Sequence, residues 1–291
     1  MPEVSVIIPS FNCADYIAGS IDSVLRQTLQ DFEIIVVDDG SADDTRRVID
    51  RYLVDPRFRY IHQPNCGLPG ARNTGARAAR APYLAFLDAD DALDAGALEK
   101  MWTALARSEA CWCVIDLLKV CGAKSEMRKT QVPAGNLFYG ILRDDFIRRG
   151  MFLRRDVFMA VGMYDEEMKN REDWDLNIRM LERGKAFVYV PEPLYLYSWR
   201  EGSITTGNPA KMLFYTERVL RKHHKRLADS GDALAAKLYA ENLWELARKH
   251  FYGSRNIRKA LACMRESFIY DMSLRRLLHP VFHQFQRLVT S

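Results

Sequence analysis

The sequence contains no apolar run that approaches the ~20 consecutive residues of a membrane-spanning helix. Its first apolar segment begins at Val4, which leaves no room for a secretory signal peptide. Its six cysteines follow neither the spacing of a zinc ribbon nor that of a Cys-x-x-Cys redox pair. These absences predict a cytoplasmic protein whose cysteines are free thiols.

A phosphate-binding loop of a common type is also missing. The glycine-rich segment at residues 65–75 has neither Gly-x-Gly-x-x-Gly spacing nor the Lys-Ser/Thr pair of a Walker loop. It leads instead into a predicted helix that carries Arg72. Because a helix N-terminus offers free N–H groups, contact of Arg72 with a phosphate or a base is one interpretation, and a solvated arginine is the other.

The charge is distributed unevenly along the 291 residues. Residues 201–291 hold 16 Lys and Arg against 8 Asp and Glu, whereas residues 1–200 hold 26 against 30. A basic region joined to an acidic body predicts an anionic partner, either nucleic acid or an anionic lipid surface. The amphipathic end of the chain, described below, favours the lipid, so nucleic acid is not the partner we expect.

The first half alternates short apolar strands with helices, which predicts an α/β fold with a mostly parallel central sheet flanked by helices. The predicted strands are residues 4–8, 32–37, 58–62 and 83–87, and the predicted helices are residues 14–26, 42–53, 68–79 and 96–107. Further along, the pattern predicts strands at 111–120, 186–190 and 194–199, a helix at 174–183 and a polar loop at 122–136.

From residue 209 onward the periodicity is helical only, with breaks near Ser230 and Gly253. We therefore expect a first domain at 1–207, with halves 1–107 and 108–207, followed by an all-helical region at 208–291. The last segment, 274–289, places leucine, valine and phenylalanine on one side of a helix and arginine and histidine on the other. It predicts binding to a membrane surface, or docking on the body or on a second subunit in a homodimer.

Polar segments follow three of the predicted parallel strands. They are 9–12, 38–41 and the acidic run Asp88-Ala89-Asp90-Asp91. Because ligands bind beyond the carboxyl ends of parallel strands, we expect these segments to share one edge of the sheet. Crowded carboxylates require positive charge, for which Mg²⁺ or Mn²⁺ is a candidate. Taken alone, the run favours an Asp-rich turn that caps the next helix, and only its context among the N-terminal segments favours the cation.

Two further acids, Glu172 and Asp173, open the predicted helix at 174–183. The positive end of the helix dipole favours their ionised forms. A carboxylate that is ionised at neutral pH can act as a general base toward a hydroxyl group. Simple helix capping is the alternative.

Taken together, the segments resemble glycosyltransferase family two over residues 3–205. The six motifs that carry the resemblance are Val4 to Asn12, Ile34 to Ser41, Asn65 to Gly75, Phe86 to Asp91, Gly162 to Glu166 and Glu172 to Leu176. The resemblance implies a GT-A (Rossmann-like) fold and metal-dependent, inverting transfer of a sugar from a nucleoside diphosphate donor to a hydroxyl. The implied setting is the synthesis of cell-surface polysaccharide or glycolipid, with a saccharide or lipid-linked acceptor. If the amphipathic segment 274–289 binds a membrane surface, we expect the protein at the inner face of the cell membrane.

The resemblance also implies roles for single residues. Asp173 is the implied catalytic base with Glu172 beside it, and Asp90 with Asp88 is implied to hold Mn²⁺ or Mg²⁺. Some relatives use a histidine after the last strand as a further ligand; Arg200 stands near that place here, which leaves the third metal ligand open. The implied nucleotide-binding residues are Pro9, Ser10, Phe11, Asp39, which reads a base that is often uracil, Arg72 and Asp88.

Two other functions fit part of the pattern. A nucleotidyltransferase also uses strand-end carboxylates with Mg²⁺, but the Glu172-Asp173 pair and the missing glycine-rich loop with its lysine argue against it. A non-catalytic subunit that binds nucleotide-sugars is the second alternative. Every acid expected of an active enzyme is present, which argues against a non-catalytic subunit.

Overall fold

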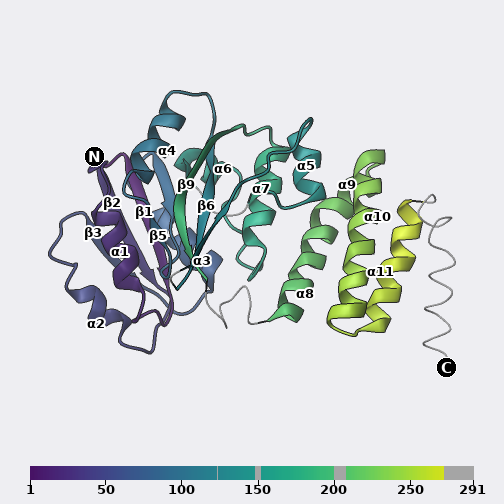
Figure 1. Ribbon diagram of the computed structural model, residues 1–291, viewed down its shortest axis with the longest axis horizontal. Coiled ribbons are helices and arrows are strands. Elements are labelled where there is room, and N and C mark those ends of the chain that lie inside the picture. Colours follow the sequence, from purple (N-terminus) through teal and green to yellow (C-terminus); the bar gives the residue numbers. More distant parts are fainter. Residues whose placement is uncertain (123, 148–151, 200–207, 272–291) are drawn as a thin grey trace. The chain divides into compact units, whose positions relative to one another are not determined.

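The computed structural model describes residues 1–122, 124–147, 152–199 and 208–271. Within these ranges the chain forms two compact units, drawn in Figure 1. The first unit takes in residues 1–132 and 146–200, and the second takes in residues 133–145 and 201–291. Arg200 and the amphipathic segment 274–289 lie outside the described residues.

The first unit is an α/β structure. Its strands are β1 (Val4–Ser10), β2 (Phe32–Asp38), β3 (Phe58–His62), β4 (Tyr83–Phe86), β5 (Ala92–Leu93), β6 (Trp112–Cys121), β7 (Lys124–Arg128), β8 (Phe152–Arg154) and β9 (Phe187–Ser198). Its helices are α1 (Ile17–Leu25), α2 (Thr45–Asp50), α3 (Leu68–Ala78), α4 (Ala97–Ala106), α6 (Arg155–Ala160) and α7 (Glu172–Glu182).

The described strands form one sheet in the order β3-β2-β1-β4-β8-β6-β9-β5, with β7 paired to β6. The parallel pairing expected for the first four strands is confirmed. Beyond β4 the sheet is mixed, because β8 runs antiparallel to both β4 and β6. The carboxyl ends of β1, β2 and β4 therefore lie at one edge, as the sequence predicted.

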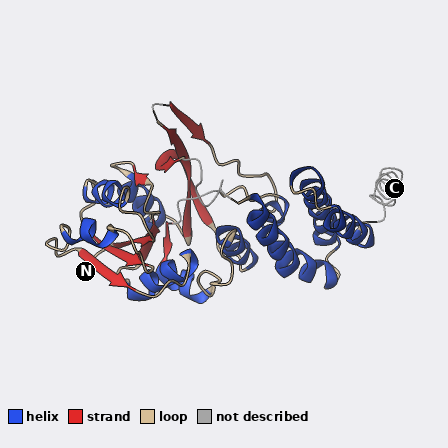
Figure 2. Cartoon of the chain, turned by 90° about the horizontal axis from the view of Figure 1, so that it is seen from below, coloured by secondary structure: helices blue, strands red, loops and turns tan. Residues whose placement is uncertain are grey.

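Helices cover both faces of the parallel strands, which Figure 2 shows in blue around the red strands. Val6 and Ile8 of β1 pack with Ile21 of α1 in one buried cluster. The alternate residue Ile7 faces α3, and a Cβ atom on Gly75 would lie 2.4 Å from the Cγ2 atom of Ile7. Glycine at this position therefore allows α3 to approach β1 closely, which fixes the start of α3 and the side chain of Arg72 near the sheet edge.

Two local predictions were wrong. Part of the expected loop at 122–136 forms β7, which pairs antiparallel with β6. The two short strands predicted after 186 form one strand, β9, whose register shifts from Ile115–Val190 to Asp116–Pro193. Proline lacks the N–H group for the ladder, so the strand accommodates this stretch with an irregularity instead of ending.

The described secondary-structure elements of the second unit are all helical. Its elements are α5 (Leu137–Arg143), α8 (Pro209–Val219), the π-helical turn η1 (Leu220–Lys225), α9 (Arg226–Asp229), α10 (Ala233–Arg248), the π-helical turn η2 (Lys249–Gly253) and α11 (Ile257–Tyr270). The predicted breaks near Ser230 and Gly253 are confirmed. In the described parts of the chain, no helix combines the length and apolarity needed to cross a bilayer.

One helix of this unit comes from the middle of the chain. The carbonyl oxygen of Leu142 in α5 accepts a hydrogen bond of 2.8 Å from Asn242 Nδ2 and lies 2.6 Å from His224 Nε2. The hydroxyl of Tyr139 donates to Asp232 over 2.8 Å. These contacts attach 133–145 to helices that follow it by about a hundred residues in the sequence.

Candidate functional site

The ends of β1 and β2 form the first part of the site. Ser10 lies opposite Asp38 in the parallel register, and the backbone N–H of Asp39 donates to the Ser10 carbonyl over 2.8 Å. Phe11, just beyond the strand, is 49% exposed. The Ser10 hydroxyl oxygen is buried and has no hydrogen-bond partner among the described residues. This edge thus offers an exposed aromatic ring beside polar groups.

Asp39 organises the neighbouring loop. Its Oδ1 atom accepts hydrogen bonds from Gln63 Nε2 (2.7 Å) and Cys66 N (2.8 Å), and its Oδ2 atom accepts one from Gly67 N (2.8 Å). The turn after it uses Gly40 at φ +82°, which favours glycine. A carboxylate has about four acceptor positions, so one position remains for a further donor.

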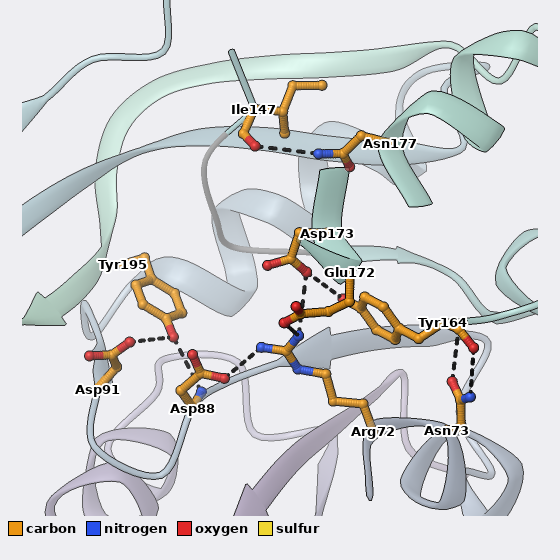
Figure 3. Close-up of polar contacts among 10 residues, drawn as sticks. All are labelled: Arg72, Asn73, Asp88, Asp91, Ile147, Tyr164, Glu172, Asp173, Asn177 and Tyr195. Atoms are coloured by element: carbon orange, nitrogen blue, oxygen red, sulfur yellow. Dashed lines mark hydrogen bonds and ion pairs between the residues drawn. The ribbon is translucent and has the colours of Figure 1, made fainter. Parts of the chain in front are cut away.

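The side chain of Arg72 lies among three carboxylates from distant parts of the chain, as Figure 3 shows. Its Nη2 atom is 2.7 Å from Asp88 Oδ1, and its Nη1 atom is 3.0 Å from Glu172 Oε1 and 3.4 Å from Asp173 Oδ1. Only 6% of the Arg72 side chain is exposed. One buried guanidinium therefore connects the strand-end acids to the acids of α7.

This cluster is crowded with negative charge. Burial and the neighbouring charge of Asp173 raise the pKa of Glu172 to about 7, although Arg72 acts in the opposite direction. Burial opposes the charge on Arg72, but the carboxylates of Asp88 and Asp173 outweigh it and raise the pKa of the guanidinium. One cation for three acids leaves an excess of negative charge.

Asp173 stands in the first turn of α7, at the positive end of the helix dipole. Its Oδ1 atom accepts a hydrogen bond from the Tyr164 hydroxyl over 3.1 Å in addition to the contact with Arg72. The Asp173 side chain is 24% exposed, so it is the most accessible acid in contact with Arg72. Its position at the start of α7 and its exposure leave this carboxylate accessible to a ligand.

The acidic run after β4 divides into two kinds of residue. Ligand atoms from Asp88, Asp90 and Asp91 all lie within 4.8 Å of one another. Asp91 is buried, and its two carboxylate oxygens accept hydrogen bonds from the Tyr195 hydroxyl (2.7 Å) and the Ser198 N–H (2.8 Å). Asp91 thus attaches β9 to this loop, while Asp88 and Asp90 are less buried and better placed to hold a divalent cation.

The structure brings most of the predicted site residues to one sheet edge but divides them into groups. Arg72, expected near the base or ribose, contacts Asp88, Glu172 and Asp173. Asp39 contacts the loop 63–67 instead of this cluster. Tyr164 was missed as a functional residue, although it stands in one of the six motifs; the signal was its position in the motif, and no sequence feature indicated its contact with Asp173.

Comparisons with known proteins, by sequence and by structure, identify proteins similar to this chain. The sequence profile described as glycosyl transferase family 2 matches residues 5–162. An uncharacterized glycosyltransferase, EpsJ of Bacillus subtilis, is 31% identical over 225 residues, which cover 70% of this chain and 63% of EpsJ. The chondroitin synthase of Pasteurella multocida is 31% identical over 198 residues, which cover 64% of this chain and 19% of the synthase. The chain thus spans less than two thirds of the length of either relative.

Among solved structures, S. aureus TarS 1–349 in complex with UDP-GlcNAc aligns with a TM-score of 0.71. The match covers 99% of this chain and 88% of that one at 18% sequence identity. At this sequence identity, structural similarity is evidence for the fold alone, and it confirms the predicted fold class.

Proposed function

The chain belongs to glycosyl transferase family 2, and on this premise we propose that it transfers a sugar, with inversion at the anomeric carbon, from a nucleoside diphosphate donor to a hydroxyl acceptor. The observation that supports the proposal most is the position of Asp173. Its carboxylate is partly exposed at a helix N-terminus and is connected through one arginine to the strand-end acid Asp88. In this proposal the base and the donor site are therefore adjacent.

The donor is a uridine diphosphate sugar in this proposal. The TarS structure of the same fold was solved with UDP-GlcNAc, which makes this compound the first donor to test. Pro9, Ser10 and Phe11 line the nucleoside, and the remaining acceptor position of Asp39 takes a hydrogen bond from the base. Arg72 contributes by holding Asp88, which faces the ribose or the metal.

A divalent cation, Mn²⁺ or Mg²⁺, fits the residues present, since Asp88 and Asp90 supply oxygen ligands in a cluster with excess negative charge. When bound, such an ion neutralises charge that develops on the leaving diphosphate. Asp91 is already used for structure through Tyr195 and Ser198. The proposed ligands are therefore Asp88 and Asp90.

Asp173 acts as the general base. Its carboxylate takes the proton of the acceptor hydroxyl as that oxygen forms a bond to the anomeric carbon. The bond from the anomeric carbon to the diphosphate oxygen breaks, and the nucleoside diphosphate leaves with the electron pair. Attack from the face opposite the leaving group gives inversion without a covalent enzyme intermediate. Glu172 holds the Arg72 side chain in place, and the same guanidinium nitrogen of Arg72 also contacts Asp173.

The proposed pathway is the assembly of a cell-surface polysaccharide or glycolipid, with a saccharide or lipid-linked hydroxyl as acceptor. The similarity to a chondroitin synthase supports this class of acceptor. Comparing UDP release from different UDP-sugars identifies the sugar that is transferred.

The test combines binding and turnover. Calorimetric titration of UDP should show binding that requires Mn²⁺, and UDP release should be measured with UDP-GlcNAc and other UDP-sugars, with and without saccharide and lipid-linked acceptors. Asp173→Asn should lower turnover by about 10²–10⁴-fold and leave the Kd of UDP unchanged. Asp31→Asn, an exposed acid away from the site, is the matched control. Wild-type protein that binds UDP with Mn²⁺ but never releases it from any donor would favour a binding subunit instead.

A location at the membrane surface is part of the proposal. The predicted amphipathic segment 274–289 lies outside the described residues, but η2 and the start of α11 give separate support. Between Glu245 and Glu266 the sequence has six Lys and Arg and no acid. In this stretch Lys249, Arg255 and Arg258 are exposed, and Tyr252 is 71% exposed.

Exposed cations around an exposed tyrosine suit an anionic lipid surface, where each Lys or Arg contributes about 1 kcal/mol. Sedimentation with vesicles of anionic and of neutral phospholipid tests this location. Lys249, Arg255 and Arg258 changed together to Glu should reduce binding to the anionic vesicles only. Equal binding of wild type to both vesicle types would contradict it.

A further inference from the structure

The two oxygens of the Asp173 carboxylate have different surroundings. Oδ1 accepts a hydrogen bond from the Tyr164 hydroxyl over 3.1 Å and contacts Arg72 Nη1 over 3.4 Å. No hydrogen bond to Oδ2 is found among the described residues, and a quarter of the side chain is exposed. One oxygen is therefore held by the protein, and the other is available to solvent or to an incoming hydroxyl.

We infer that Tyr164 is a positioning residue for the base, and that Asp173 accepts the acceptor's proton through Oδ2 while Tyr164 and Arg72 hold Oδ1. This inference rests on the proposed role of Asp173 and deepens it. The two donors fix the rotation of the carboxylate, so that the Oδ2 atom has a constant direction.

The position of Tyr164 is unusually well determined. Its backbone N–H donates to Asn73 Oδ1 (3.0 Å) and its carbonyl accepts from Asn73 Nδ2 (2.9 Å). Its ring packs edge-on against Phe86 and Phe158, with centroids 5.4 and 5.5 Å apart. The Arg72 guanidinium carbon lies 5.1 Å from the ring centroid. Backbone and ring are both anchored, so the hydroxyl has one direction in which to point.

The hydroxyl itself remains protonated. Burial first, and then the negative charge of Asp173, raise the pKa of Tyr164 well above its usual value of about 10. A phenol that keeps its proton is a permanent donor to Oδ1 at any pH where the enzyme would work. Tyr164 therefore directs the base and does not take part in proton transfer itself.

Tyr164→Phe tests the inference, because phenylalanine keeps the ring contacts with Phe86, Phe158 and Arg72 and removes only the donor. The rate of UDP release from UDP-GlcNAc with Mn²⁺ is measured against donor concentration. We expect kcat to fall about tenfold, because the carboxylate loses the donor that fixes its rotation, with the KM for UDP-GlcNAc and the Kd of UDP unchanged. Tyr139→Phe, which loses a hydroxyl that bonds to Asp232 in the second unit, is the matched control and should behave like wild type.

A second readout does not depend on turnover. In protein labelled with ¹³C at the aspartate carboxyl carbons, the Asp173 signal is identified by its loss in Asp173→Asn, and its chemical shift should change in Tyr164→Phe because Oδ1 loses a hydrogen bond. An unchanged chemical shift, or an unchanged kcat, would overturn the positioning role. Full activity of Asp173→Asn would instead remove the proposed base, whatever Tyr164→Phe does. Thermal melting of Tyr164→Phe shows whether the variant is folded.

Discussion

In the first unit one guanidinium, that of Arg72, faces the carboxylates of Asp88, Glu172 and Asp173. In the second unit Arg221 lies between Glu217 and Glu266, and Lys259 is 3.7 Å from Glu217. Two cations thus face two acids in the second unit, whereas one cation faces three acids in the first. The balanced network supports helix packing, and the unbalanced cluster keeps a negative charge that a metal ion can neutralise.

The pKa values of buried groups also differ between the two units. Burial and the charge of Asp173 raise the pKa of Glu172 to about 7, because another negative charge in the cluster is unfavourable. In the second unit burial lowers the pKa of His224 to about 4, because a positive charge there would lose its hydration. Charge crowding of the kind found in the first unit is typical of functional sites, and the low pKa of His224 in the second unit is typical of a packed core.

Removing the arginine of each network should distinguish them most clearly. Arg72→Met leaves buried acids without a partner and should lower the free energy of unfolding by about 3–5 kcal/mol at pH 7. Arg221 is 42% exposed, so Arg221→Met should cost only about 1 kcal/mol. Urea unfolding of both variants measures the difference. Equal losses in the free energy of unfolding would mean that the two networks contribute equally to stability.

The pH dependence of Glu172 provides the next largest effect. Between its usual pKa of about 4.5 and about 7, folded Glu172 keeps a proton that the unfolded chain releases, so its contribution to stability falls as the pH rises through this window. Glu172→Gln should remove this fall and be more stable than wild type at pH 8 by about 2–3 kcal/mol. Urea unfolding at pH 5 and pH 8 checks it; parallel curves for both proteins would contradict the charge crowding.

His224 should show a dependence of opposite sign. Between pH 6.5 and about 4 the unfolded chain binds a proton that folded His224 does not, so stability falls as the pH decreases. At pH 5 the loss from this group should be about 2 kcal/mol. His224→Gln keeps a donor for the Leu142 carbonyl and should reduce the loss between pH 7 and pH 5. Thermal melting at both pH values measures it, with His62→Gln, an exposed histidine, as the control.

Much of the site could be predicted because its signals are local. The continuous apolar runs of β1 and β2 indicate strands buried on both faces, and Asp39 follows β2 directly. Of the strands that were missed, β5 and β8 have two and three residues, too few for a periodic pattern. The attachment of 133–145 to the second unit was not predicted either, since its contacts with α10 join residues far apart in the sequence.

The sequence by itself determined the family, the parallel strands and the placement of Asp39, Asp88 and Asp173 at strand ends or a helix start. These features follow from periodicity, backbone preferences and the helix dipole, all of which act over a few neighbouring residues. Only the tertiary structure decided that Arg72 meets Glu172, a hundred positions away, and that Tyr164 holds one oxygen of Asp173. Such partners are chosen when distant segments pack together, and the charges and rotations they impose exist only in the folded chain.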